Sequence, residues 1–561
     1  MSQNKTTSTS SVQVCKNCKK DFTIEPDDFA FYEKIAVPPP THCPECRQQR
    51  RYAWRNDRNL YRRTCDLCGK STVALYQSDK PFKVYCQPCW WSDAWDATTY
   101  GRDYDPAKPM FQQLADLQKV VPRIAMLGKN SVRSEYTNHS SDNKDCFMGS
   151  SLVDCENVMY SYFVFHSKDC VDCMMIYVKS ERCYECVDVD GCYQCQFCEL
   201  CNQCAQCSYC YDCRGCTDCF LSSNLRSKSN YFLNQQYSKE EYRKKVAEFN
   251  FGSYETRKKL YQQFLDLKKD SLHKYATIER STNCTGDHIF NSKNVRNGFS
   301  IDKAEDVSYT INAEEIKDSM DIYQSGFKIE LLYECNAQIR NYNSKFCNCT
   351  YDVSHLEYCD LCFNSQNFFG CIGLKKGEYM ILNKKYSPED FKILKARIIS
   401  DMRERGEYGE FFPISLSPFA LNETHVALFM PEKIQEKAVV GSFGKETMQP
   451  DVIPDDIKDV PDDIAKQVLK CVTCSRNYNI VEPELAFYRR EVIPIPRQCY
   501  PCRDAARIAL RAPRKLYHRS CMCALSHPHH TGQCPNEFET PYAPDRLETV
   551  YCESCYQQEV V

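Results

Sequence analysis

A twelve-residue period dominates the middle of this chain and strongly restricts the folds open to it. Cysteine occupies every third position from Cys192 to Cys219, ten in succession. Positions twelve apart form two cysteine series, Cys183, Cys195, Cys207 and Cys219, and Cys335, Cys347, Cys359 and Cys371. A fixed short period is typical of a solenoid, in which each coil buries its inward face against the next. We therefore predict a mainly β fold with two β-solenoid segments.

The role of the repeated cysteines follows from the width of such a coil. A twelve-residue coil is narrow, so its inward positions admit only small side chains, and cysteine is a small, readily buried residue. The favoured interpretation is that these thiols are simply the core. The alternative is that some stacked thiols bind zinc or iron–sulfur clusters, for which cysteine thiolates are the usual ligands.

The solenoid pattern is duplicated, and helices flank both copies. The first copy ends LRSKSNYFLNQQYSKEEY from Leu225, and the second ends LKKGEYMILNKKYSPEDF from Leu374. Each then shows a helix-capping signal, Ser238 with Glu241 or Ser387-Pro388 with Asp390. Apolar spacing predicts capping helices near residues 110–120, 239–248, 254–270 and 388–404.

The two ends of the chain are also copies of each other. Residues 15–65 are rebuilt at 471–521 with a constant offset of 456. Two C-x-x-C pairs supply the four thiolates of a closed tetrahedral zinc site. The predicted ligands are Cys15, Cys18, Cys43 and Cys46 at one end, and Cys471, Cys474, Cys499 and Cys502 at the other.

A second metal site is predicted beside each of these. The N-terminal ligands are Cys65, Cys68, Cys86 and Cys89, with the spacing of a zinc ribbon. The C-terminal copy departs from this spacing, and there we predict the ligands Cys521, Cys523, Cys552 and Cys555. His529, His530 and Cys534 are candidates for binding a further ion. Alternatively, they hold the inserted segment in place. The expected cofactor is zinc, three to five ions in all.

Several of these motifs occur together in a known family. They are the C-x-x-C pairs, the aromatic pairs Phe31-Tyr32 and Phe487-Tyr488, the proline-rich approach, and C-P-x-C-R at residues 43–47. In these features the chain resembles the treble-clef "probable zinc-binding" (zinc-ribbon) family of uncharacterised bacterial proteins. The resemblance covers both ends specifically and the middle loosely. It implies zinc binding and no established activity.

An arginine series follows the second cysteine pair in both copies. The segment up to Cys65 is polar and free of glycine, which predicts a helix with the arginines on one face. With interleaved aromatic residues they can contact nucleic acid. Alternatively they neutralise the thiolates or face protein. The candidates for nucleic-acid binding are Arg47, Arg51, Arg55, Arg58, Arg503, Arg507 and Arg511.

Composition narrows the classes of function. Basic and acidic residues nearly balance, 72 against 75, so no global charge attracts phosphate. The N-terminus lacks the apolar segment of a signal peptide, and no apolar run approaches the length of a membrane span. We expect a cytoplasmic protein whose 40 cysteines stay reduced. Nucleotide-binding motifs and catalytic constellations do not emerge, which predicts a protein that is not an enzyme.

The predicted organisation places a metal module at each end of a duplicated solenoid. We expect a zinc-stabilised scaffold with a protein partner, no membrane and no small-molecule substrate. Nucleic-acid binding and thiol-based metal or redox buffering are the alternatives. The predicted segments are a disordered tail (1–12), a double zinc module (13–100), a helical connector (101–133), solenoid 1 (134–236), a helical segment (237–280), solenoid 2 (281–386), a helix (387–411), a linker (412–468) and a C-terminal zinc module (469–561).

Overall fold

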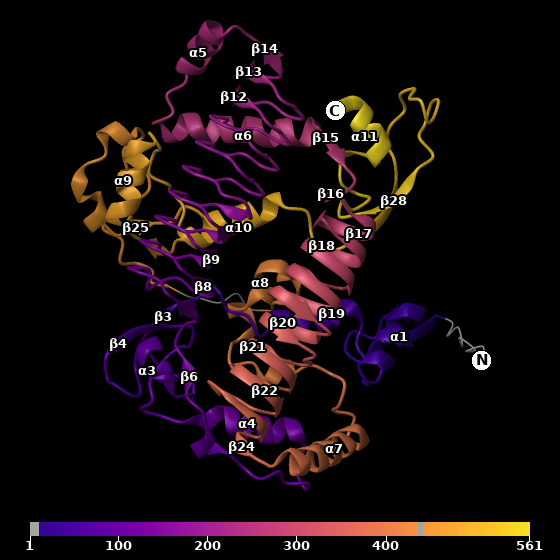
Figure 1. Ribbon diagram of the computed structural model, residues 1–561. Helices are drawn as coiled ribbons and strands as arrows, with labels where there is room; N and C mark the ends of the chain where they lie inside the picture. Colours follow the sequence, from indigo (N-terminus) through magenta and orange to yellow (C-terminus); the bar gives the residue numbers. More distant parts are fainter. Residues whose placement is uncertain (1–9, 436–440, 561) are drawn as a thin grey trace. The chain divides into compact units, whose positions relative to one another are not determined.

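The chain forms two compact units, each built from two separate stretches of sequence (Figure 1). The computed structural model describes residues 10–435 and 441–560. Unit 1 comprises Met1–Ala125 and Ala276–Lys437, and unit 2 comprises Met126–Tyr275 and Ala438–Val561. The N-terminal module therefore shares a unit with the second repeat segment, and the C-terminal module shares a unit with the first.

The N-terminal module (residues 11–91) consists of two hairpins, the first followed by two helices and the second by a short strand and a helix. Residues 1–9 of the predicted tail lie outside the described residues, and the next residues already enter a strand. The elements are β1 (Ser11–Val14), β2 (Asp21–Ile24), α1 (Pro26–Lys34), α2 (Pro44–Tyr52), β3 (Tyr61–Thr64), β4 (Ser71–Ala74), β5 (Val84–Tyr85) and α3 (Gln87–Trp91). A connector follows, with η1 (Ala97–Tyr100), α4 (Met110–Val120) and β6 (Arg123–Ile124), which pairs with β5.

The arginine-rich helix is shorter than the sequence predicted. It ends at Tyr52, and the later arginine Arg63 lies on β3. The side-chain oxygen of Asn56 accepts hydrogen bonds from the backbone amides of Arg58 and Asn59. Such a local side-chain bond competes with helical hydrogen bonding and favours a turn.

The second ladder (residues 278–385) forms a nine-stranded sheet in unit 1. Its strands from β16 to β23 pair in parallel, mostly with partners twelve residues apart, such as Ile301 with Ala313. The strands are β16 (Ile278–Glu279), β17 (Thr282–Phe290), β18 (Lys293–Ser308), β19 (Ile311–Glu330), β20 (Tyr333–Tyr342), β21 (Asn348–Glu357), β22 (Phe363–Phe369), β23 (Gly377–Ile381) and β24 (Lys384–Lys385). The elements that follow are α7 (Pro388–Glu404), η2 (Ile414–Leu416), η3 (Leu421–Glu423), α8 (His425–Phe429) and η4 (Pro431–Lys433).

The first ladder (residues 128–236) has the same register in unit 2 but shorter strands. Its middle is joined by single bridges at twelve-residue spacing, such as Tyr193 with Ala205. The strands are β7 (Gly128–Lys129), β8 (Ser140–Ser141), β9 (Ser150–Val153), β10 (Tyr162–Phe165), β11 (Met174–Ile176), β12 (Thr217–Phe220), β13 (Ser229–Phe232) and β14 (Gln235–Gln236). Helices α5 (Lys239–Ala247) and α6 (Tyr254–Asp270) and strand β15 (Leu272–Lys274) follow.

The backbone explains why cysteine recurs at every third position. In both ladders a non-glycine residue with positive φ recurs with the same spacing, for example Gln203, Gln206 and Tyr209. Each three-residue side thus carries an inward residue, a residue that pairs with the next coil, and a left-handed corner. Four such sides make twelve residues. The same register aligns Cys335, Cys347, Cys359 and Cys371, whose thiols interact along one column, as predicted.

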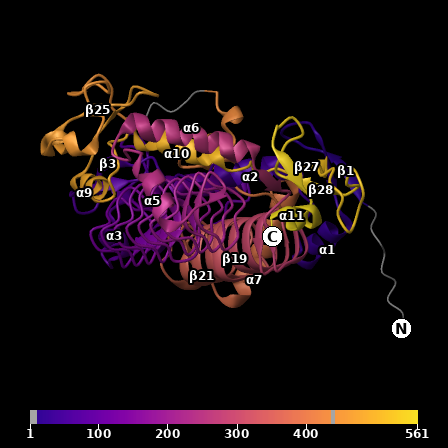
Figure 2. The ribbon, with the colours of Figure 1, turned by 90° about the horizontal axis from the view of Figure 1, so that it is seen from above.

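The C-terminal module (residues 469–560) repeats the hairpin-and-helix pattern. Its elements are β25 (Leu469–Lys470), β26 (Asn477–Tyr478), α9 (Glu482–Arg490), α10 (Tyr500–Leu510), β27 (Tyr517–Ser520), β28 (Glu537–Thr540), β29 (Thr549–Tyr551) and α11 (Glu553–Val560). Figure 2 shows α6 and α10 from above, and the Lys268 ammonium near the end of α6 donates to the Leu510 carbonyl at the end of α10. β29 pairs in parallel with β15.

The expectation of a mainly β chain needs correction, and parts of the predicted linker are packed against the units. Helices and strands are mixed along the chain. Within the predicted linker, Val426 is buried in unit 1, and Ile457 and Ile464 belong to a buried cluster in unit 2, where η5 (Ile457–Asp459) and η6 (Asp462–Lys466) form. Residues 436–440 lie outside the described residues. Across the described part of the chain, no helix has the length and apolarity needed to cross a membrane.

Candidate metal centres

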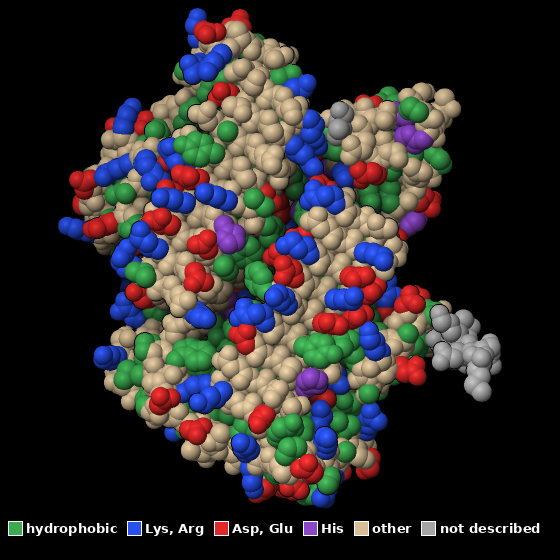
Figure 3. Space-filling view, in the orientation of Figure 1, with side chains coloured by type: hydrophobic (Ala, Val, Ile, Leu, Met, Phe, Trp, Pro, Cys, Tyr) green, Lys and Arg blue, Asp and Glu red, His purple; other side chains and the backbone are tan. Residues whose placement is uncertain are grey.

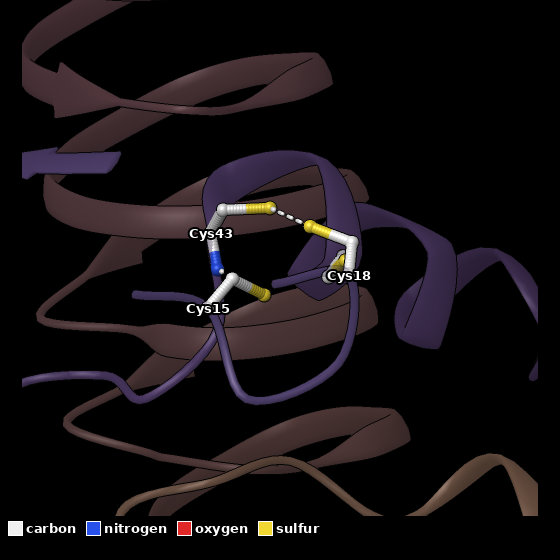
Figure 4. Close-up of side chains that lie close together, drawn as sticks. Cys15, Cys18 and Cys43 are labelled. Atoms are coloured by element: carbon white, nitrogen blue, oxygen red, sulfur yellow. Dashed lines mark hydrogen bonds between the residues drawn. The ribbon is translucent and has the colours of Figure 1, made fainter. Parts of the chain in front are cut away.

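The first set of thiols lies where a hairpin turn meets the start of a helix. Cys15 and Cys18 flank the turn between β1 and β2, and Cys43 and Cys46 open α2. Figure 4 shows Cys15, Cys18 and Cys43 pointing toward one another. Their ligand atoms, with that of Cys46, all lie within 4.8 Å of one another. The Cys18 and Cys43 sulfurs are 3.7 Å apart, close to the ~3.8 Å edge that Zn–S bonds of ~2.3 Å produce.

Backbone N–H groups at this site stabilise the thiolate form of cysteine. The Cys43 amide donates to the Cys15 sulfur at 3.3 Å. Burial raises the pKa of Cys15, but the amides of Cys43, Cys18 and Asn17 outweigh it and lower the pKa to about 6. The thiolate is the form that binds metal, so these donors favour a loaded site.

The C-terminal module brings the equivalent residues together. Cys471, Cys474, Cys499 and Cys502 form one set, with 3.6 Å between the sulfurs of Cys474 and Cys499. Cys499 precedes α10 as Cys43 precedes α2. Residues related by the sequence offset of 456 therefore form equivalent four-cysteine sites in the two modules.

The second N-terminal set follows the same design. Cys65, Cys68, Cys86 and Cys89 converge where the β3–β4 turn meets the start of α3, and the sulfurs of Cys68 and Cys86 are 3.9 Å apart. Burial raises the pKa of Cys65, but backbone amides of Cys68, Cys86 and Leu67 lower it to about 6. All eight N-terminal cysteines thus divide into the two quartets that their spacing predicted.

The C-terminal counterpart differs from the prediction in one ligand. The converging set is Cys521, Cys534, Cys552 and Cys555, so Cys534 takes the place predicted for Cys523. The strand pairing supplies the reason. β27 matches β3 at an offset of 456, but β28 matches β4 at 466, because ten residues are inserted between them. Cys68 therefore corresponds to Cys534, and the bond from the Cys65 amide to the Lys70 carbonyl recurs from Cys521 to Asn536.

The inserted residues hold the displaced cysteine and the histidines. Cys523, His527, His530 and Cys555 form a further set of converging ligand atoms. His529, the other predicted histidine candidate, has its Nε2 atom 3.3 Å from the Cys555 sulfur. His527 belongs to the histidine cluster of the insertion but was not among the predicted ligands, although its position four residues after Cys523 was a usable signal.

The predicted nucleic-acid arginines point into their own units instead. In unit 1, Arg47 Nε lies 2.9 Å from Asp321, and Arg51 pairs with both Asp321 and Glu334. In unit 2, Arg503 Nε lies 3.0 Å from Asp172, and Arg507 pairs with Asp172 and Glu185. These arginine side chains are at most 4% exposed, so they are not available to phosphates.

The remaining arginines of the series are also engaged or shielded. Arg55 lies 2.7 Å from Asp57, and Arg511 lies 2.7 Å from Asp188. The guanidinium nitrogens of Arg58 are shielded from solvent. The prediction of nucleic-acid binding through these arginines is therefore wrong. Of the alternatives weighed, the protein-facing one holds, and the protein faced is the ladder of the same unit.

Both modules dock on their ladders through equivalent residues. The ladders match at an offset of 149, which relates Asp172 to Asp321 and Glu185 to Glu334. Arg503 stacks over Tyr160 with 4.9 Å to the ring centre, and Arg47 stacks over Tyr309 with 5.4 Å. Asp172 and Glu185 lie in neighbouring coils, thirteen residues apart, and so do Asp321 and Glu334. This step is one residue longer than the usual twelve.

The ladder thiols behave as core. The sulfur of Cys201 is hydrogen-bonded to the carbonyls of Glu199 and Cys210, at 3.4 and 3.6 Å, and this pattern recurs along the ladder. Burial raises the pKa of Cys146 to about 11 and that of Cys155 to about 12, which keeps these thiols neutral. Other ladder thiols shift the other way: hydrogen bonds with the thiols of Cys170 and Cys186 lower the pKa of Cys183 to about 6. Burial and the recurring carbonyl contacts are therefore what mark these thiols as core.

The four quartets of thiols can each hold a metal ion, and the donor set favours a tetrahedral, thiophilic one. No known protein family matches the chain, and no curated protein matches it either.

Proposed function

We propose that this protein is a zinc-stabilised, non-enzymatic scaffold that presents β-solenoid surfaces to a protein partner. Parallel pairing at twelve-residue spacing, with a left-handed corner at every third residue, supports two β-solenoids. Hairpin-and-helix sites of four cysteines support treble-clef and zinc-ribbon modules, with one zinc ion in each quartet.

The modules contribute rigidity to the solenoids. A closed zinc site stabilises the fold that carries it, since the ion binds only the folded arrangement. Buried ion pairs then fix each module to one ladder. The cytoplasm is the compartment we propose, because all 40 cysteines are free and the thiol sites need reducing conditions.

The observation that carries the proposal is the open face of the second ladder. One shallow groove there is lined by Arg340, Asp352, Asn364, Gln366 and Glu378, and another by residues of β18 to β20 that include Lys303, Glu315, Lys328 and Glu330. Figure 3 shows basic and acidic side chains interspersed over β18 to β20. Mixed charge along an extended strip suits an extended protein segment more than a small molecule or a polyanion.

Site-specific cross-linking tests this proposal. A photoreactive residue is placed at Lys328 or Gln366, both exposed on the grooved face, in the full-length protein made in its own cells. The matched control carries the same residue at Lys392, exposed on α7. We expect both groove positions to capture the same protein and the control to capture none. Adducts with nucleic acid, or equal capture at the control, would overturn the proposal.

A further inference from the structure

The insertion in the C-terminal module carries a metal-ligand set of its own. Residues 523–534 form a loop closed by a 2.8 Å hydrogen bond from the Cys534 amide to the Cys523 carbonyl. The N-terminal module has a three-residue step from Cys65 to Cys68 in the same place. The insertion thus adds Cys523, His527 and His530 beside a quartet that is complete without them.

The added ligand atoms converge on Cys555. The Cys523 sulfur lies 3.2 Å from His527 Nε2, and His530 Nε2 lies 3.1 Å from the Cys555 sulfur. A tetrahedral ion with Zn–S of ~2.3 Å and Zn–N of ~2.0–2.1 Å separates such atoms by ~3.5 Å. The set therefore needs only a small expansion to hold an ion.

The local backbone orients the side chains of both His527 and His530. His527 and His530 exchange two backbone hydrogen bonds, 2.9 and 3.2 Å long, across a tight turn that contains Pro528. Nδ1 of His530 lies 2.9 Å from the Gly532 carbonyl, to which it can only donate. Because Nδ1 carries the proton, Nε2 keeps its lone pair and faces Cys555. Metal-bound histidines are held in one tautomer in the same way, by a hydrogen bond from the nitrogen that does not bind the metal.

The loop buries a histidine ring while it exposes an apolar side chain. Leu525 is 50% exposed. The His527 side chain is 6% exposed, and Cys523 is fully buried. Burying a polar ring costs free energy unless the ring gains a partner. The neighbours of His527 Nε2 are the Cys523 sulfur, at 3.2 Å, and a carboxylate oxygen of Glu559, at 3.6 Å.

We propose that the C-terminal module binds a pair of zinc ions that share the Cys555 thiolate. One ion takes Cys521, Cys534, Cys552 and Cys555, and the other takes Cys523, His527, His530 and Cys555. A thiolate sulfur has lone pairs enough for two ions. One ion with four thiolates carries a net charge of 2 − 4 = −2, and two ions with the five thiolates of both sets carry 4 − 5 = −1. The second ion therefore reduces the charge that the module must accommodate.

Zinc content of full-length variants tests the second ion. The proposal rests on zinc in the four quartets, so the wild type should hold five zinc ions per chain, four in quartets and one more. Cys523→Ala, His527→Ala and His530→Ala should each lose one ion, because the quartet stays intact. His529→Ala tests the alternative ligand, since the His529 Nε2 atom lies 3.3 Å from the Cys555 sulfur, and this variant should keep all five ions. Four ions in the wild type would overturn this inference alone, whereas none would overturn the zinc proposal as well.

Cadmium substitution tests the shared sulfur. In the protein loaded with ¹¹³Cd, two C-terminal resonances should show mutual coupling through Cys555, and Cys523→Ala should remove both the coupling and one resonance. The N-terminal quartet of Cys65, Cys68, Cys86 and Cys89 provides an uncoupled resonance for comparison. Five resonances without coupling would overturn the bridge. Loss of the fifth ion in His529→Ala but not in His530→Ala would overturn the proposed ligand set.

Discussion

Arg507 Nη1 lies 2.9 Å from a carboxylate oxygen of Asp172, and neither side chain is more than 1% exposed. The same relationship holds between Arg51 and Asp321, also 2.9 Å apart. One pair joins the C-terminal module to the first ladder, and the other joins the N-terminal module to the second. Two equivalent buried ion pairs thus connect the ends of the chain to its middle.

Removing one partner of such a pair should destabilise one unit only. Arg507→Ala leaves Asp172 buried beside Arg503 alone, and breaking a buried pair costs about 3–5 kcal/mol. We expect unit 2 to unfold earlier while unit 1 is unchanged, as followed by hydrogen exchange of the two ladders. Arg51→Ala is the matched control and should affect unit 1 instead. Equal loss of protection in both ladders would contradict the pairing of modules and ladders.

Chelation should separate the two classes of cysteine. Removing metal should make module thiols such as Cys18 and Cys68 reactive toward iodoacetamide, whereas Cys201 and its neighbours stay protected in the core. Mass spectrometry of alkylated peptides measures this directly. Cys201→Ala should cost about 1–3 kcal/mol, in the lower part of the range for truncated core residues. Rapid labelling of the first ladder in the native protein would revive the thiol-buffer interpretation.

Loss of one ligand should unfold one hairpin-and-helix site. Cys43→Ser should remove one zinc ion and expose α1 and α2 to protease, because a closed site contributes folding energy directly. The C-terminal module serves as the internal control, and its peptides should remain resistant. An unchanged digestion pattern with full zinc content would show that Cys43 is not a ligand.

Acid should weaken unit 2 through His273. Burial lowers the pKa of His273 to about 4, and its Nδ1 atom lies 2.8 Å from the Tyr211 hydroxyl. The unfolded value is ~6.5, so the unfolded chain binds more protons between these values. The contribution of His273 is complete above ~pH 6.5 and decreases as the pH falls, by about 2 kcal/mol at about pH 5.

Chemical unfolding of unit 2 at two pH values, with zinc content checked at each, measures this effect. The His273→Gln variant should show a weaker dependence on pH over the same range. If wild type and variant respond equally, other groups carry the acid sensitivity.

Spacing alone located most of the metal ligands, because C-x-x-C turns are local. It misassigned Cys523 for a physical reason. The nearest cysteine after Cys521 seemed the natural partner, but strand pairing selects Cys534 across the insertion. The offset of 466 that relates Cys68, Cys86 and Cys89 to Cys534, Cys552 and Cys555 was present in the sequence and would have revealed this.

The partners of the arginines were out of reach of local reasoning. Arg51 and Asp321 are 270 positions apart, and nothing near either residue identifies the other. The duplicated acids Asp172 and Asp321 were a weak sign that the arginines have partners in the ladders. Acidic residues are common at the corners of both ladders, and what sets these two apart is their position at the slip in each ladder. The helix boundary at Tyr52 was also missed, because the side-chain bond of Asn56 overrides a helix-compatible composition.

The interleaving of the two units has a consequence for biosynthesis. The ribosome releases the N-terminal module and then the first ladder before any of the second ladder exists. During that interval Asp172 and Glu185, which present the same chemistry as Asp321 and Glu334, are already available to Arg47 and Arg51. We therefore expect the nascent chain to be open to mispairing until Asp321 and Glu334 emerge. A chain that lacks residues 469–561 would leave Asp172 without its cations, since Arg503 and Arg507 belong to that segment.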